Sequence, residues 1–234
     1  MMKKIFIFSS VGSPLSDEYK NSVYESWQLD QYDSGCVIYS KEDSFDYAKY
    51  FDTNICHSGF KFPNFFYFLD RFPDMLDNYN YFAILDDDLF FNQTQTLEKC
   101  VFFMDRYDLD ICSISNSNAI KKTTYSVMAA NKLRNEIWIT NFCELGFMII
   151  RKNLLNCFID YYNTNLKNHC LDWGMDFAIC NFASSHNNKI GIIKNMTFTN
   201  PRQKIRNYSK VNLNASIDKY VYYHIPKIIN KYTI

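Results

Sequence analysis

Three consecutive aspartates, Asp86, Asp87 and Asp88, follow an apolar run over residues 81–85 that has the composition of a buried strand. Three adjacent carboxylates repel one another and are costly to bury unless a cation or a ring of donors neutralises them. Hard divalent cations take such oxygen ligands, and α/β folds bind ligands at the carboxyl ends of strands. The triplet therefore predicts a site for a divalent metal and a diphosphate. The alternative is a solvated turn or a helix cap.

A second acidic group, Glu144, stands between two apolar runs, residues 137–143 and 147–150, and is followed by Gly146. Glycine inside a strand pattern marks a break, so Glu144 is expected to be presented at that break. A β-bulge with Glu144 in solvent is the alternative.

A third run contains Asp172, Trp173, Gly174 and Asp176. The glycine permits a tight turn, and residues 175–183 have the spacing of a helix that begins there. An indole beside a glycine and two acids could form a platform for a sugar together with a base. A carboxylate at a helix N-terminus is also stabilised by the helix dipole, so capping is the plainer role for Asp176.

Other candidates lie near the two ends of the chain. Ser9 and Ser10 open a predicted loop of small residues, 9–14, after a first strand, and are candidates for a nucleotide pocket. Asn200 and Arg202 follow a predicted strand that begins at 189, and His224 lies in an aromatic, basic tail. A single histidine without a visible partner is more often a surface residue than a ligand.

The elements that must position these groups alternate between strands and helices, which indicates one α/β layer structure. Strands are predicted at residues 3–8, 36–39, 81–86, 109–114 and 189–193 and on both sides of Glu144, and helices at 17–29, 61–76, 95–107, 151–166 and 175–183. Residues 41–59 are expected to form a loop with a short helix, and 120–135 a mobile polar segment.

Composition limits the function classes. The 234 residues are 47% hydrophobic, enough for a large core, and the 25 basic residues balance 25 acidic ones. Nothing global therefore favours nucleic acid, and the basic stretch 204–210 lacks the interleaved aromatic residues of a stacking groove. The eight cysteines form no C-x-x-C pair, and the apolar run among the first residues is too short for an export signal. Both observations predict a cytoplasmic protein.

Taken in order, the three motifs resemble those of GT-A fold nucleotide-sugar glycosyltransferases. The runs 140–150, 172–176 and 191–202 also resemble a poorly characterised family known mainly as a domain of unknown function. The resemblance implies a single Rossmann-related α/β domain over 1–234, with a mixed central sheet flanked by helices. It implies a nucleotide-sugar half at 1–115, an acceptor half at 116–202 and a tail at 203–234.

The resemblance also assigns roles. Asp86 and Asp88 would hold Mn²⁺ or Mg²⁺ on the donor diphosphate, with Asp87 beside the donor. Trp173, Gly174 and Asp176 look like the W-G-x-(E/D)-D segment of galactosyltransferases and N-acetylgalactosaminyltransferases, whose acid sits beside the acceptor. Asp176 is thus the expected base, with Glu144 or Asp172 second. The family's usual metal-binding histidine is replaced by Asn200 and its neighbours, so Asn200 or His224 is expected as third ligand, and Arg202 as a binding residue.

The expected activity is metal-dependent transfer of a sugar, from a UDP-sugar for preference, to a hydroxyl of a glycan or lipid-linked saccharide in surface polysaccharide synthesis. Such an enzyme would work in the cytoplasm, with peripheral association at the inner face of the membrane left open. One alternative is a phosphohydrolase of the haloacid-dehalogenase type, although Phe90 stands where its motif has Thr or Val. The other is a non-catalytic nucleotide- or carbohydrate-binding protein.

Overall fold

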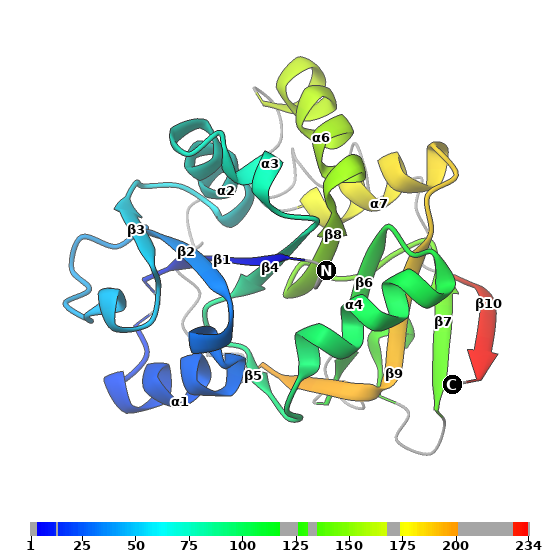
Figure 1. Cartoon of the computed structure of the whole chain (residues 1–234), viewed down its shortest axis with the longest axis horizontal. Helices are drawn as coiled ribbons and strands as arrows, with labels where there is room; N and C mark the ends of the chain where they lie inside the picture. Colours follow the sequence, from blue (N-terminus) through cyan, green and yellow to red (C-terminus); the bar gives the residue numbers. More distant parts are fainter. Residues whose placement is uncertain are drawn as a thin grey trace.

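The computed structural model describes residues 4–12, 14–117, 126–130, 135–167, 174–200 and 227–233. Within them, ten strands form one mixed sheet in the order β10-β7-β9-β6-β8-β4-β1-β2-β3, with β5 beside β9 (Figure 1). The strands are β1 (Ile5–Val11), β2 (Asp33–Ile38), β3 (Thr53–Cys56), β4 (Tyr81–Asp86), β5 (Phe90–Phe91), β6 (Ile111–Asn116), β7 (Glu136–Thr140), β8 (Phe147–Arg151), β9 (Ile190–Thr199) and β10 (Ile228–Thr233). The expected mixed central sheet is confirmed.

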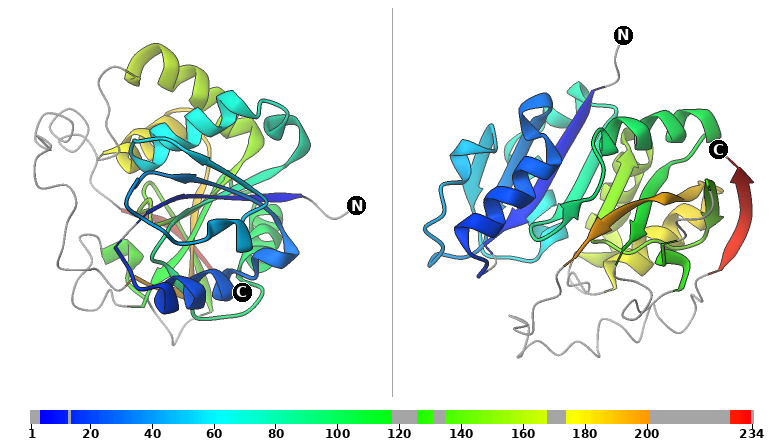
Figure 2. Two further views of the ribbon diagram at one scale, coloured as in Figure 1. Left: turned by 90° about the vertical axis from the view of Figure 1, so that its left-hand side faces the viewer. Right: turned by 90° about the horizontal axis from the view of Figure 1, so that it is seen from below.

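Helices cover both faces of this sheet. They are α1 (Asp17–Trp27), α2 (Lys61–Arg71), α3 (Met75–Asn78), α4 (Thr96–Tyr107), α6 (Lys152–Tyr161) and α7 (Met175–Ser185). Short helical turns add η1 (Leu29–Gln31), η2 (Tyr47–Lys49), η3 (Ser126–Met128) and η4 (Tyr162–Leu166). Figure 2 shows α1 and α4 on one side of the sheet and α2, α6 and α7 on the other. None of the helices in the described ranges is long and apolar enough to cross a membrane.

The strands β4, β1, β2 and β3 form a parallel half-sheet. All seven residues of β1 are buried, because helices lie against both of its faces. The chain goes from β1 to β2 on one side and returns to β4 on the other, so the strand order reverses between β1 and β4. Open sheets of this kind bind ligands in the crevice outside the carboxyl ends of the strands at that reversal.

The other half of the sheet continues from β4 without a break. β8 pairs antiparallel with β4, which sets Leu85 opposite Phe147. β6 and β9 lie beyond β8 and run parallel to each other. The end of β9 bends back to pair with β5, with Thr199 opposite Phe90. The segment after the aspartates is therefore fixed to a strand that lies more than a hundred residues further along the chain.

Helix α1 follows from its sequence. Ser16 caps it by accepting the Tyr19 N–H at 3.3 Å, and acidic residues fill its first turn, where the helix dipole favours them. Its buried positions recur at helical spacing, so that one stripe faces the sheet. They are Lys20, Val23, Tyr24 and Trp27.

The expected helices at 17–29, 95–107, 151–166 and 175–183 are confirmed within a few residues, with the last turn of the third in η4. Three expectations are wrong. The helix predicted at 61–76 ends at Arg71, because Phe72 precedes Pro73 and is held away from helical geometry. Residues 41–59 contain the expected short helix, η2, but also an unexpected strand, β3. The loop expected from Ser9 begins only at Gly12, because Ser9 and Ser10 pair within β1. The prediction for 120–135 lies largely outside the described residues.

Candidate active site

The acidic triplet lies at the carboxyl end of β4, beside the end of β1, where the strand order reverses. Ser10 of β1 is the pairing partner of Asp86. The site that the sequence predicts at a strand end is therefore placed where α/β sheets bind ligands.

The first two aspartates have different partners. Asp86 has a carboxylate that is 37% exposed and that forms an ion pair with Lys61. Asp87, expected beside the donor, is buried and accepts the N–H of Gly12 at 3.1 Å. Gly12 has φ +138°, and a Cβ there would lie 2.9 Å from the Ser40 nitrogen, so this contact requires glycine. Asp86 and Asp88 are therefore the pair that can share a ligand.

Asp88 is partly buried between its acidic neighbours. Burial first, and then the charges of Asp86 and Asp87, raise the pKa of its carboxyl group to about 8, against the lowering effect of Lys61. A carboxyl group in this position is unfavourable when ionised in the free protein. A cation placed between Asp86 and Asp88 would relieve that repulsion, which is what a metal site requires.

Helix α1 holds the backbone of the acidic turn. The Trp27 indole N–H donates to the Leu89 carbonyl at 2.7 Å, and the Tyr19 hydroxyl donates to the Asp88 carbonyl at 3.3 Å. The Phe91 N–H donates to the Ser26 hydroxyl at 3.1 Å. Because three contacts fix these peptide groups, the direction of the Asp88 side chain is set by the fold rather than by the local sequence.

Lys61 is a site residue that the sequence does not reveal. It is the first residue of α2, its side chain is only 7% exposed, and its ammonium group donates to Asp86 and, at 2.6 Å, to the Leu145 carbonyl. A lysine at the start of an aromatic helix carries no sequence signal for such a role. Its partners lie far from it in the sequence and come next to it only when the sheet forms.

The start of α2 is held by a buried amide. Asn64, fully buried, donates from Nδ2 to the Ser10 hydroxyl at 2.7 Å and to the Gly59 carbonyl at 3.1 Å, while its Oδ1 lies 2.9 Å from His57 Nδ1. Ser10 thereby positions α2, and hence Lys61. Ser9, also buried, donates to the Leu85 carbonyl at 3.0 Å and so ties β1 to β4.

The second motif meets the first across the sheet. The Asp86 N–H donates to the Gly146 carbonyl at 2.9 Å, and a methyl group on Gly146 would lie 3.4 Å from Asp86 Oδ2. Glu144 lies in the same short connection between β7 and β8 and is half-buried. The structure therefore brings the Glu144 segment to the edge of the acidic site.

The helix that carries the described part of the third motif, α7, contacts the Glu144 segment. Cys143 and Cys180 are buried with their sulfur atoms 4.0 Å apart, which joins the Glu144 segment to α7. Asp176 is in the first turn of α7, with Gly174 at the N-cap at φ 90°, and its Oδ1 accepts the Phe177 N–H at 2.9 Å. Asp176 is thus not the N-cap itself.

Four predicted site residues lie outside the described residues, and the structure says nothing of their roles: Asp172, Trp173, Arg202 and His224.

The donor atoms present fit a divalent metal. Asp86 and Asp88 offer hard oxygen ligands, and Mg²⁺ is usually held by one or two carboxylates together with substrate phosphates. Asn200 is the residue after Thr199, whose partner in β5 is Phe90, so it lies near the acidic turn. In the described part of the chain, no group of three His, Cys, Asp or Glu side chains is arranged around one ion. The remaining ligands would then come from the diphosphate.

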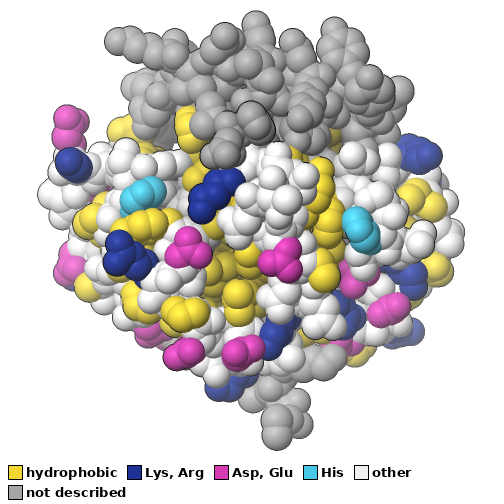
Figure 3. All heavy atoms as spheres, turned by 90° about the horizontal axis from the view of Figure 1, so that it is seen from above, with side chains coloured by type: hydrophobic (Ala, Val, Ile, Leu, Met, Phe, Trp, Pro, Cys, Tyr) yellow, Lys and Arg dark blue, Asp and Glu magenta, His cyan; other side chains and the backbone are white. Residues whose placement is uncertain are grey.

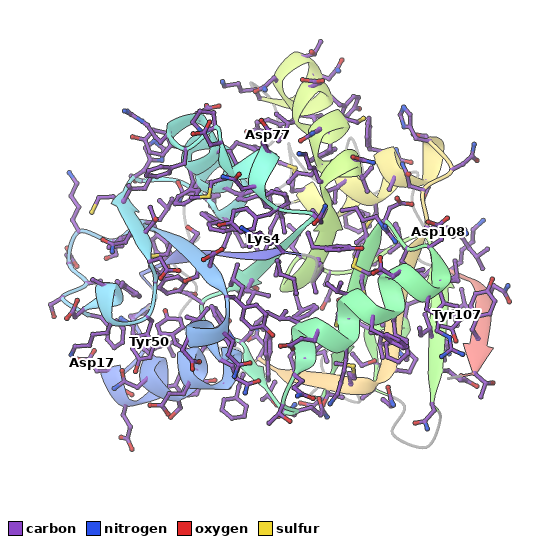
Figure 4. All side chains as sticks on the ribbon, in the orientation of Figure 1. Lys4, Asp17, Tyr50, Asp77, Tyr107 and Asp108 are labelled. Atoms are coloured by element: carbon purple, nitrogen blue, oxygen red, sulfur yellow. The ribbon has the colours of Figure 1, made fainter. Side chains whose placement is uncertain are left out.

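A large cleft of about 1080 Å³ lies elsewhere. It is lined by the amino ends of β1 and β2, including Lys4 and Asp33, and by Tyr50, and so opens at the opposite end of the strands from Asp86. Lys4 and Tyr50 are labelled in Figure 4. Size alone does not make this cleft the active site, because the candidate metal-binding carboxylates are at the other end.

Comparison with known proteins gives a fold but no family. No family model and no curated protein matches the chain. The mannosyltransferase PcManGT from Pyrobaculum calidifontis, solved with GDP-Man and Mn²⁺, matches with a TM-score of 0.56 at 14% identity, over 88% of this chain and 58% of that one. A197 from STIV matches with a TM-score of 0.50 at 15% identity, over 84% of each chain. The chain thus shares the fold of a glycosyltransferase, as its motif order predicts.

Proposed function

We propose that this protein is a metal-dependent glycosyltransferase that moves a sugar from a nucleotide-sugar donor to a hydroxyl of a glycan or lipid-linked saccharide. The observation that carries the proposal is the position of Asp86 and Asp88 at the carboxyl ends of β4 and β1, on a fold shared with a mannosyltransferase. Departure of the donor's diphosphate creates negative charge, which a divalent ion at these carboxylates would stabilise.

In this proposal the protein's own residues divide the work. Asp86 and Asp88 hold the metal with the diphosphate, and Asn200 or His224 is the third protein ligand. Asp87 fixes the loop at Gly12. Asp176 takes the proton of the acceptor hydroxyl, with Glu144 or Asp172 as the alternative base, while Trp173, Gly174 and Arg202 contact the sugars. Proton removal by a carboxylate requires that it be ionised and close to the hydroxyl.

The donor is proposed to be a UDP-sugar, although the mannosyltransferase of similar fold was solved with GDP-Man. Figure 3 shows acidic and basic side chains interspersed with apolar ones on the face formed by α2 and α6, which offers no broad field of one sign.

The test is a thermal-shift screen of UDP-, GDP-, CMP- and TDP-sugars with and without Mn²⁺. A ligand that binds only the folded protein raises its melting temperature, by an amount that depends on affinity and concentration. We expect one donor class to stabilise the protein more strongly with Mn²⁺, and Asp88→Ala to abolish that extra shift. If Asp88→Ala folds and keeps the full Mn²⁺-dependent shift, the metal assignment is wrong. Binding without transfer or hydrolysis of any donor would favour a non-catalytic binding protein.

A further inference from the structure

The ion pair between Lys61 and Asp86 occupies the place where the proposed metal would bind. The ammonium group lies on Asp86 Oδ1 and on the Leu145 carbonyl, with the lysine side chain 7% exposed. A charge so nearly removed from water depends on these two partners, because an unpaired buried ammonium is strongly unfavourable.

A divalent cation and the lysine ammonium group repel each other when both bind the same carboxylate. Metal binding to Asp86 would bring two positive charges together and remove the ammonium's charged partner. The lysine side chain has a flexible four-carbon stem, so its ammonium could move to a new anionic partner if one were present. A donor diphosphate is such a partner.

We propose that Lys61 is a built-in counter-ion of the metal site. It neutralises Asp86 in the free protein, opposes binding of the metal alone, and moves to a diphosphate oxygen when donor and metal bind together. The inference rests on the proposed function and adds to it a regulation of the same site: metal and nucleotide bind with positive coupling, and each raises the affinity for the other.

The test measures Mn²⁺ affinity without nucleotide, by the loss of the free-ion signal in electron paramagnetic resonance. Lys61→Met keeps an unbranched side chain that is one atom shorter and removes its charge. We expect it to bind Mn²⁺ about tenfold or more tightly than the parent, which is the usual scale for a charged hydrogen-bond partner. Its affinity for UDP or GDP without metal should fall by a similar factor. If Lys61 had only a structural role, its loss would disorder Asp86, and the variant would bind Mn²⁺ more weakly than the parent.

Two control variants separate charge from other effects. Lys61→Arg keeps a positive charge and should bind Mn²⁺ as weakly as the parent. Lys152 lies away from the site, and its ammonium group pairs with the Asp77 carboxylate at 3.2 Å. Lys152→Met should therefore leave Mn²⁺ affinity unchanged. If Lys61→Met does not fold, Lys61→Gln is used, because its amide can still donate to Leu145 and Asp86 without a charge.

Failure of the inference can be told from failure of the proposed function. If the parent binds Mn²⁺ with nucleotide, and the folded neutral variants bind Mn²⁺ alone no more tightly than the parent, only the counter-ion role is overturned. Equal Mn²⁺ affinity of the parent with and without nucleoside diphosphate would also overturn it. If the parent binds neither Mn²⁺ nor any nucleotide, both proposals are wrong.

Discussion

Replacing Asp88 by asparagine should make the metal-free protein more stable, and more so as the pH rises. The pKa of Asp88 is raised to about 8 by burial and by Asp86 and Asp87, whereas an unfolded chain has an aspartate pKa near 3.8. Between about pH 4 and pH 8 the folded protein therefore holds a proton that the unfolded chain releases. Since the folded state binds more protons, the free energy of unfolding falls as the pH rises through this range. The Asp88→Asn variant would have no such loss, because its amide does not titrate.

The size of the effect follows from the width of this window. A single group of this kind changes the free energy of unfolding by at most about 1.4 kcal/mol per pH unit. Asp88 is only partly buried, and solvent screening reduces the value, so we take roughly half of it. Between about pH 5 and about pH 7.5 the variant should then gain roughly 2 kcal/mol over the parent. For a chain of this length that is roughly 4–8 °C in melting temperature.

The assay is thermal unfolding of both proteins in a chelator at several pH values. Asp108→Asn is the matched control, because Asp108 has a side chain that is 83% exposed and a left-handed backbone, φ 54°, that asparagine also adopts. It removes a surface carboxylate, so that a change common to both variants is not specific to Asp88. A constant difference in melting temperature between Asp88→Asn and the parent from about pH 5 to about pH 7.5 would refute the reasoning about Asp88.

Two further predictions concern Asp176 and Lys194. Asp176→Asn should lower kcat by ~10²- to 10⁴-fold and leave donor affinity unchanged, because in the proposed function Asp176 is the general base and not a metal ligand; near-parental turnover would transfer the role to Glu144 or Asp172. Lys194→Met should lower the melting temperature by several degrees, because the fully buried Lys194 donates to the carbonyls of Val127, at 2.8 Å, and Ala129, and each unpaired carbonyl costs about 1–3 kcal/mol. Burial lowers the pKa of Lys194 to about 8, so the parent should gain stability between about pH 8 and 10 and the variant should not; equal pH profiles would contradict this.

Local sequence determines much of the fold. The stripe of Lys20, Val23, Tyr24 and Trp27 specifies the buried face of α1, since side chains at helical spacing share one side. The apolar run before Asp86 specifies β4, and the alternation of such elements specifies an α/β sheet. Where a local signal was weaker than a distant contact, prediction failed: β3 is a short half-exposed strand held by its pairing with β2, and Ser9 is kept in β1 by pairing with Cys36 and Leu85.

The sequence specifies only part of the candidate site. The sequence alone determined that Asp86, Asp87 and Asp88 follow a buried strand and that Glu144 and Gly146 lie at a break between apolar segments, and it predicted a cation at the acidic triplet. Only the tertiary structure decided that Asp87 turns to Gly12, that Asp86 meets Lys61, and that the Gly146 carbonyl reaches the Asp86 N–H. The reason is that side-chain direction and strand register depend on pairing between segments far apart in the chain, such as β4 with β8, and no local pattern of residues encodes which of three adjacent carboxylates will face the ligand.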